Sequence, residues 1–309
     1  MPLELQSHWH LYITIDNPDH KLRQMTTDKI SEFISQADRT MRSVVKIMLA
    51  PHRSDIPRIE TTANNTAIIM GNGPSLATAI NENFSQLTSY PTFAVNFMGN
   101  TPEYTVIKPR YYVLIDPAFF KNAANYRNVQ DLIRRFEHDT DWPMTLFVPY
   151  WGRKSMPRFN NPCIDVRYLS TNGLEGFGWF ERWAFGQRLG TPRPRNVLIP
   201  SIMIAIAAGY RNIYLAGADH TWARTLSVNE NNEVVSIQPH FYKDNEEYEQ
   251  RARQVFVGRK LHEVYEAYAV AFKSYYSILR YASGLGVNIY NATPGSFIDA
   301  FPRRPLSEL

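Results

Sequence analysis

The residues best suited to bind a ligand follow a short apolar run at 66–70. There the chain continues as Gly71-Asn72-Gly73-Pro74-Ser75. Two glycines allow a sharp turn and a close approach of a ligand, and Ser75 can cap a following helix. Because free N–H groups at a helix N-terminus attract anions, the turn predicts a phosphate site, with a mere tight turn as the alternative. A third glycine at the dinucleotide-fingerprint spacing is missing, which disfavours NAD.

Polar side chains also end two later apolar runs. Asn96 closes the run at 92–97, and Asp116 follows the run at 111–115. Ligands of open parallel sheets bind outside the carboxyl ends of the strands, so Asn72, Asn96 and Asp116 should converge on one crevice. Amide and carboxylate groups suit the hydroxyls of a ribose or the edge of a base, although each residue alone also fits turn capping.

A second group of reactive side chains follows the segment at 196–216. A helix at 201–208 and a strand at 212–216 would deliver Asp219 and His220 to the same edge of the sheet. Such a pair can supply a base, a nucleophile with an orienting partner, or a hydrogen-bonded corner.

Two further histidines and two arginines are candidates for proton transfer and anion binding. His240 and His262 are candidate bases, and the helix that His262 begins would keep its imidazole neutral. Arg193 and Arg195 end a stretch without acidic residues, so they either neutralise a phosphate or an anionic acceptor, or form a solvated basic face.

The composition excludes several classes of protein. The excess of 33 Lys and Arg over 29 Asp and Glu leaves a charge of +4, too small and scattered to indicate a nucleic-acid partner. A single cysteine, Cys163, excludes a disulfide framework and favours a reducing, cytoplasmic compartment. Neither a signal peptide nor an apolar run of about 18 residues is present. Because no metal-ligand constellation stands out, we expect a site without metal or cofactor.

The apolar pattern predicts an α/β fold with a doubly wound, mostly parallel, Rossmann-like sheet. Short runs that are apolar almost throughout alternate with helical segments, as in parallel sheets covered on both faces. The domain spans 62–303, with two long insertions at 149–195 and 219–260 and a tail at 304–309. The predicted strands lie at 66–70, 92–97, 111–115, 144–148, 212–216 and 287–290.

Residues 1–61 form a separate N-terminal extension in this scheme. From Thr27 to about Ala50, apolar residues recur three and four apart, which predicts an amphipathic helix. This helix would pack onto the main domain, contact a membrane surface, or join two copies of the chain.

Several motifs resemble a known group of enzymes. GNGPSL at 71–76, Asn96, LIDPAFF at 114–120 and AIAAGYRNIYLAGAD at 205–219 resemble the bacterial CMP-sialic-acid-dependent sialyltransferases. The related MptE-like proteins, which include motility accessory factors, are more similar still. That closer resemblance rests on GADHTW (217–222), HFY (240–242), LHE (261–263) and NATPGSFIDAFPR (291–303), and the whole covers 62–303.

The resemblance implies roles for individual positions. Asn72 and Asn96 match asparagines that contact the nucleotide and donor, whereas Asp116 stands where those enzymes carry asparagine. Asn196 lies where they carry an Arg-x-x-Ser-Gly segment, and it is the nearest substitute.

The implied activity is metal-independent transfer of a CMP-activated nonulosonic or Kdo-like sugar to a glycan or lipid-linked acceptor of the cell surface, at the inner face of the membrane. With inversion, His262 or His240 would take the acceptor proton. With retention, Asp219 would be the nucleophile beside His220. The choice between these routes stays open.

Two other functions remain open. A 6-hydroxymethylpterin pyrophosphokinase would use ATP and Mg²⁺, with Asp116 and Asp219 as metal ligands. A binding module with a vestigial nucleotide pocket would need neither chemistry nor metal.

Overall fold

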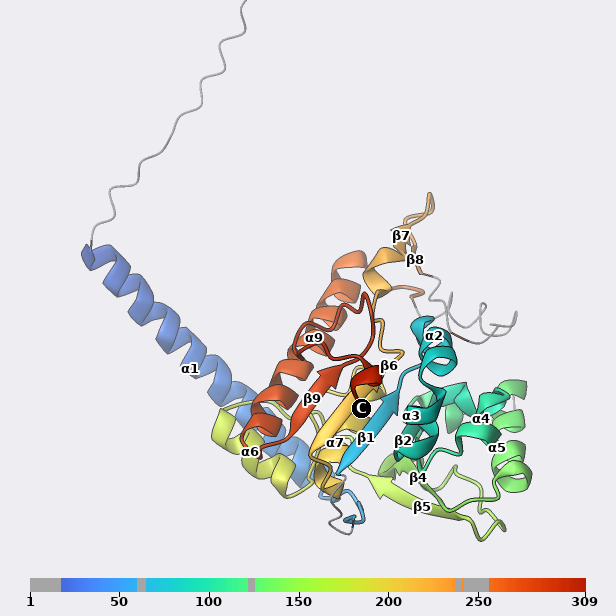
Figure 1. Cartoon of the computed structure of the whole chain (residues 1–309). Helices are drawn as coiled ribbons and strands as arrows, with labels where there is room; N and C mark the ends of the chain where they lie inside the picture. The colour runs from blue at the N-terminus through green and yellow to red at the C-terminus, as the bar shows by residue number, and fades with distance from the viewer. Residues whose placement is uncertain (1–17, 60–64, 122–125, 237–240, 242–255) are drawn as a thin grey trace, which may run out of the picture.

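The fold is a seven-stranded parallel sheet between two layers of helices (Figure 1). The computed structural model describes residues 18–59, 65–121, 126–236, 241 and 256–309, with the side chains of α1 described from Asp28. The strand order is β5-β4-β3-β2-β1-β6-β9, and every neighbouring pair is parallel. This confirms the predicted doubly wound α/β class. The strands are β1 Thr66–Met70, β2 Thr92–Val95, β3 Tyr111–Val113, β4 Met144–Pro149, β5 Ile164–Leu169, β6 Asn212–Ala216 and β9 Asn288–Asn291.

The edge strand β5 lies inside the range that the sequence assigns to the insertion at 149–195. Its Asp165 and Arg167 break the continuous apolar run that identifies the other strands. Arg167 bonds Asp165 and Asp55 at 2.8 Å each on this exposed edge. An edge strand tolerates such charges, which is why periodicity alone did not predict it.

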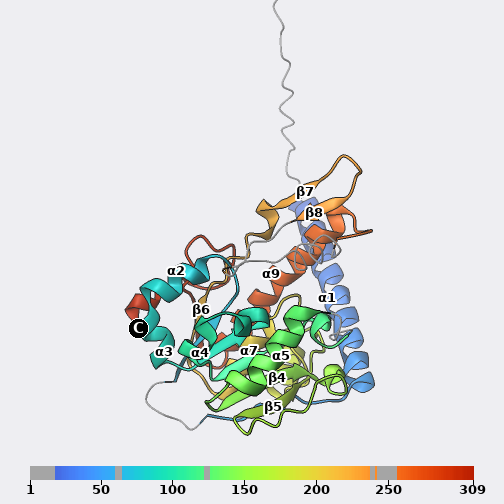
Figure 2. The same ribbon diagram turned by 90° about the vertical axis from the view of Figure 1, so that its right-hand side faces the viewer.

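Helices cover both faces of the sheet (Figure 2). One face packs against α6, α7 and α9, and the other against α2, α3, α4 and α5. The predicted helix at 201–208 is confirmed within α7. The helices are α1 Pro18–Leu49, α2 Ser75–Glu82, α3 Phe84–Ser89, α4 Glu103–Ile107, α5 Arg127–Asp139, α6 Gly178–Gly186, α7 Leu198–Ala208 and α9 Leu261–Ser283.

The winding of the chain changes direction between β1 and β6, whose ends are held together by two glycine turns. A Cβ on Gly71 would lie 2.4 Å from the carbonyl oxygen of Gly217. Gly217 has a φ of +64°, and its own Cβ would lie 2.7 Å from the carbonyl oxygen of Gly71. Neither position accepts a side chain without moving the backbone. The two turns therefore fix the switch point, where ligands of this fold class bind.

The motif at 291–303 braces the end of β6 from the outside. Thr293 Oγ1 accepts the Ala218 N–H at 3.0 Å, and Ser296 Oγ donates to the Ala218 carbonyl at 2.6 Å. Arg303 donates to the carbonyl oxygens of Thr293 and Ser296. The motif thus holds the turn that carries Asp219 and His220.

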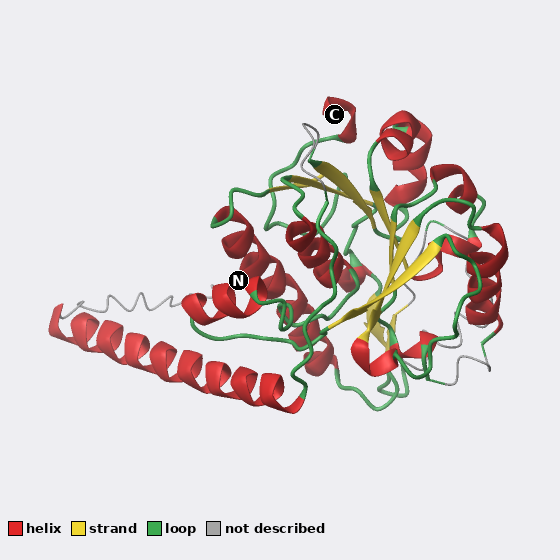
Figure 3. Ribbon diagram, turned by 90° about the horizontal axis from the view of Figure 1, so that it is seen from below, coloured by secondary structure: helices red, strands yellow, loops and turns green. Residues whose placement is uncertain are grey.

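Two elements stand apart from the layers. The hairpin of β7 Leu226–Val228 and β8 Val234–Ser236 rises near the first turns of α9, within the predicted insertion at 219–260. The long helix α1 is joined to the domain at its C-terminal end and projects away from it (Figure 3). No helix among the described residues is long and apolar enough to span a membrane.

Candidate functional site

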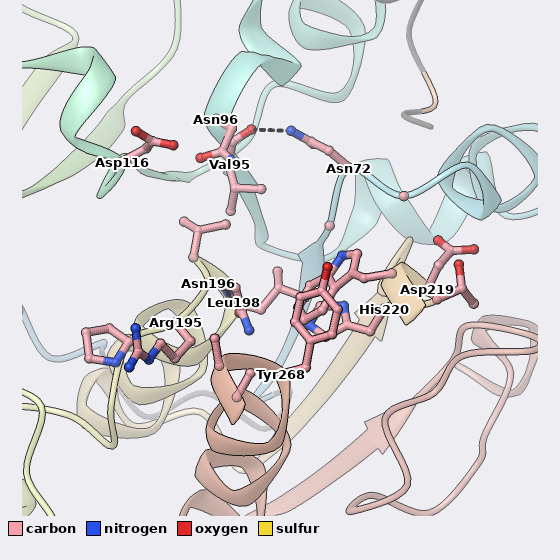
Figure 4. A pocket seen from close by; sticks show the side chains of 18 of the residues that line it. Asn72, Val95, Asn96, Asp116, Arg195, Asn196, Leu198, Asp219, His220 and Tyr268 are labelled. Carbon is pink, nitrogen blue, oxygen red and sulfur yellow. Dashed lines mark hydrogen bonds between the residues drawn. The ribbon is translucent and has the colours of Figure 1, made fainter. Parts of the chain in front are cut away.

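A pocket of about 530 Å³ opens at the carboxyl edge of the sheet, at the switch point between β1 and β6 (Figure 4). It is lined by the turns after β1, β2, β3 and β6, by the start of α7 and by one face of α9. Its size suits a small organic ligand. The pocket brings together these predicted residues: Gly71, Asn72, Gly73, Asn96, Asp116, Arg195, Asn196, Asp219 and His220.

Among the described residues, three other predicted residues, Ser75, His262 and Arg193, do not line this pocket. His262 is the second residue of α9, as expected, but its side chain is exposed outside the pocket lining. Arg193 also lies outside the lining and forms an ion pair with Glu175 at 3.6 Å. His240 lies outside the described residues. The geometry therefore offers no support for His262 as the base.

The wall formed by Asn72 and Asn96 has buried amide oxygens without partners. Asn72 Nδ2 donates to the Val95 carbonyl at 3.1 Å, which turns its Oδ1 away from that contact. Asn96 adopts a left-handed φ of 50°, and its carbonyl accepts from the Tyr112 hydroxyl at 2.6 Å. Within the described part of the chain, Oδ1 of neither asparagine has a hydrogen-bond partner. Buried acceptors of this kind are rare in proteins and suit the hydroxyl or amino groups of a ligand.

Asn196 shows the opposite pattern because its oxygen is fully used. Oδ1 accepts the N–H groups of Leu198 and Ile199 at 3.0 and 3.3 Å, which caps α7, and the Tyr275 hydroxyl at 3.1 Å. These three contacts fix the orientation of the amide. Its buried Nδ2 is left without an acceptor among the residues described. Asn196 is therefore a fixed donor in the pocket wall.

His220 supports the orientation of Asn196 through the Tyr275 hydroxyl. Its Nε2 lies 2.6 Å from the Tyr275 hydroxyl, whose single proton goes to Asn196. Nε2 must then carry the ring proton and donate to Tyr275. Burial lowers the His220 pKa to about 3. A neutral imidazole with so low a pKa is a poor base near neutral pH, so the geometry favours the hydrogen-bonded corner over the predicted catalytic roles.

Asp219 occupies the turn that the sequence assigns to a phosphate. Ser75 Oγ donates to Asp219 Oδ2 at 2.7 Å. The same oxygen would lie 1.9 Å from a Cβ on Gly73, so glycine is required there to make room for the carboxylate. A negative charge already stands beside the first residues of α2. A phosphate is therefore disfavoured at this turn, contrary to the sequence-based expectation.

The cationic end of the pocket is formed by Arg195 and Arg259. Burial, then repulsion by Arg193 and Arg259, lowers the Arg195 pKa from its usual value. Neither Arg195 nor Arg259 forms an ion pair with an acidic residue in the described segments. Two guanidinium groups close together at a pocket rim are suited to an anion.

Aromatic residues form the side of the pocket opposite the asparagines. Trp222 packs against His220 and Tyr268, with ring centroids 4.1 and 5.4 Å apart. Such faces can stack against a base or a sugar ring. Tyr268, Tyr275 and Arg259 were not among the residues predicted from the sequence. The seven-residue spacing of Tyr268 and Tyr275, which places them on one face of a helix, was the available signal.

The two predicted metal ligands are engaged in other contacts. Asp116 Oδ1 accepts the Ala118 N–H at 2.8 Å, and Asp219 Oδ2 accepts from Ser75. The described residues contain no group of three or more histidine, cysteine, aspartate or glutamate side chains that could hold a metal ion. The donor set thus gives no specific support to the pyrophosphokinase alternative.

Comparisons with known proteins find likeness among solved structures. No protein-family model matches the chain, and a search of curated proteins gives no match. Among solved structures, the MAf glycosyltransferase from Magnetospirillum magneticum AMB-1 matches with a TM-score of 0.46 and 15% identity. The match covers 88% of this chain but 38% of that one, so this chain spans well under half of its length. A likeness at this level assigns no activity.

Proposed function

We propose that the chain is a glycosyltransferase that transfers a CMP-activated nonulosonic or Kdo-like sugar to a cell-surface glycan or lipid-linked acceptor, without a metal ion. The observation that carries the proposal is a set of buried amide atoms on three residues of one pocket that have no partner within the described parts of the chain. Asn72 and Asn96 supply acceptors, and Asn196 supplies a donor. This set complements a ligand that carries both hydroxyl groups and acceptor oxygens, as a nucleotide sugar does.

The proposed pose follows from the distribution of charge. Hydroxyls of the nucleoside would donate to Asn72, Asn96 and Asp116, which lie along one wall. The phosphate would lie toward Arg195 and Arg259, away from the carboxylate of Asp219, and would accept from Nδ2 of Asn196. The sugar would stack on the aromatic side formed by Trp222 and Tyr268. The choice of cytidine rests on the sequence motifs.

In the proposed reaction, the bond between the anomeric carbon and the phosphate oxygen breaks, and CMP leaves with the electron pair. The acceptor hydroxyl forms the new bond to the anomeric carbon and releases its proton. Arginine and amide donors would stabilise the charge that develops on the phosphate. Because Asp219 is the pocket-lining carboxylate beside the switch point, we assign to it the proton of the acceptor or, with retention, the nucleophilic attack.

Thermal unfolding with and without ligands tests the binding step. We expect CMP to raise Tm in the presence of a chelator, and Asn72→Ala to reduce the shift. Asn100→Ala is the matched control, because Asn100 also has a buried oxygen without a partner but lies outside the pocket. Stabilisation by ATP with Mg²⁺ but not by CMP would overturn the proposal in favour of the pyrophosphokinase.

Release of CMP from CMP-sugars tests the chemistry. We expect Asp219→Asn to retain CMP binding and to lose transfer, since the amide keeps the shape but neither takes a proton nor attacks carbon. Transfer that persists unchanged in this variant would exclude Asp219 from the reaction.

A further inference from the structure

The helix α1 exposes a continuous apolar stripe. Ile30, Ile34, Met41 and Met48 are 56, 61, 65 and 71% exposed. Phe33 adds to it and contacts Phe177, with ring centroids 5.2 Å apart. Exposed apolar patches of this extent are uncommon on monomers and mark interaction surfaces.

The stripe differs from the face of α1 that contacts the domain. Thr40 Oγ1 accepts the Phe177 N–H at 3.0 Å, and Ser43 Oγ donates to the Glu175 carbonyl at 2.7 Å. Ser43 follows Met41 by two residues, which is roughly 200° around an α-helix. The domain therefore holds α1 by one face and leaves the apolar stripe uncovered.

The spacing of the stripe matches the seam of a two-helix contact. Apolar residues alternate at intervals of four and three over nearly three heptads, as at the a and d positions of a coiled coil. The positions are Ile30, Ile34, Ala37, Met41, Val44 and Met48, of which Val44 is half-buried against the domain and lies at the edge of the stripe. This repeat indicates that the stripe is covered by another helix.

We propose that α1 pairs in antiparallel orientation with α1 of a second copy of this chain. Residues 28–36 carry two carboxylates and one lysine, whereas residues 37–49 carry one carboxylate and three basic residues. Antiparallel pairing sets the acidic half of each helix beside the basic half of the other. A helix lying on a membrane would instead carry a polar face rich in lysine and arginine, and three carboxylates interrupt this one.

The shape of the molecule agrees with the antiparallel orientation. The domain lies at the C-terminal end of α1, and the other end projects freely (Figures 1 and 3). Antiparallel pairing places the two domains at opposite ends, whereas parallel pairing would bring them together. In the antiparallel register, a positions face d positions throughout. Ile30 lies opposite Met48, Ile34 opposite Val44, and Ala37 opposite Met41.

The mass of the chain in solution tests whether the pair forms. We expect light scattering to give twice the chain mass for the wild type and one chain mass for the double variant Ile34→Lys with Met41→Lys. Both side chains are exposed, so the domain should fold, as unchanged thermal unfolding of a diluted sample would verify. The double variant Ile34→Leu with Met41→Leu is the matched control, because it keeps the same positions apolar, and it should remain dimeric. A monomeric wild type would overturn the proposal.

Cross-linking tests the orientation, in a Cys163→Ser background. A mixture of Ile30→Cys and Met48→Cys chains should give disulfide-linked heterodimers, and either variant alone should not. Linkage of Ile30→Cys to itself indicates parallel pairing and overturns the antiparallel arrangement. Monomers that sediment with anionic vesicles, and lose this binding in the double variant, would show that the stripe serves a membrane instead.

Discussion

Asparagine side chains lie in two walls of the pocket, Asn196 in the first and Asn72 and Asn96 in the second, and their amide oxygens differ in hydrogen bonding. Around Asn196, each acceptor site is filled by α7 or by Tyr275, and His220 closes the chain of hydrogen bonds. Around Asn72 and Asn96, buried oxygens have no partner in the described structure. The acceptor of the first wall is filled before a ligand arrives, and its Asn196 Nδ2 is left open in the described structure, whereas the second wall offers open acceptors. We therefore expect loss of the contacts between Asn196, Tyr275 and His220 to affect stability, and changes to the open amide atoms of either wall to affect binding.

The largest effect on binding is expected for Asn196→Asp. The variant keeps the oxygen that caps α7 but replaces the fixed donor by a buried negative charge facing the proposed phosphate. We expect CMP affinity to fall by roughly 30- to 150-fold, about 2–3 kcal/mol. Calorimetric titration measures the affinity, and Asn100→Asp is the control outside the pocket. Equal affinity in both variants would remove Asn196 from the site.

Tyr275→Phe should lower stability more than any change in the second wall. It leaves the Nε2–H of His220 without an acceptor in a fully buried position. The free energy of unfolding should fall by about 1–3 kcal/mol in urea titrations. Tyr276→Phe, on the exposed neighbouring residue, is the matched control. If both variants unfold alike, the hydrogen-bonded wall is not a source of stability.

The contribution of the buried His220 imidazole to stability should depend on pH. The folded pKa of His220, about 3, lies below the usual 6.5, so the stability it contributes is complete above pH 6.5 and declines as the pH falls toward 3. At pH 5 the loss is roughly 2 kcal/mol. Urea titrations at several pH values should show this slope in the wild type, and His220→Gln should lack it. An identical slope in both proteins would contradict the buried neutral imidazole.

Asn72→Ala should have a smaller effect, and mainly on binding. The loss of one acceptor weakens CMP binding by about tenfold. The free energy of unfolding should change little, because the lost bond to Val95 is offset by removal of an unsatisfied buried oxygen. A loss of stability without a change in affinity would reverse the assignment of the two walls.

Arg195→Gln should have the smallest effect, because the residue lies at the open rim. We expect a decrease of a few-fold in CMP affinity that disappears at high salt. Arg182→Gln, which removes a charge outside the pocket, serves as the control. Salt-independent loss of affinity would show that Arg195 does not act through the phosphate charge.

The sequence predicted the sheet well because a parallel strand buried on both faces has a continuous apolar run. Strand β5 was missed because it lies at the edge and carries charges. The convergence of Asn72, Asn96, Asp116 and Asp219 was also predictable, since the ends of parallel strands share one edge.

The roles of individual site residues were less predictable. The turn at 71–75 looks like an anion site until the position of Asp219 is known, because only the fold places that carboxylate against Ser75. Likewise, His220 looks like a base until its burial beside Tyr275 is seen. Both corrections depend on contacts between residues far apart in the sequence, which local patterns do not encode.

The glycine turns after β1 and β6 have a consequence for how the pocket can vary. Each carbonyl fills the space that a side chain of the other glycine would need, so main chain forms this part of the pocket floor. Side chains around this floor can be exchanged without shifting it. Ligand selectivity should therefore be open to redesign by substitutions in the walls, while a side chain at Gly71 or Gly217 should displace the main chain on which any such redesign depends.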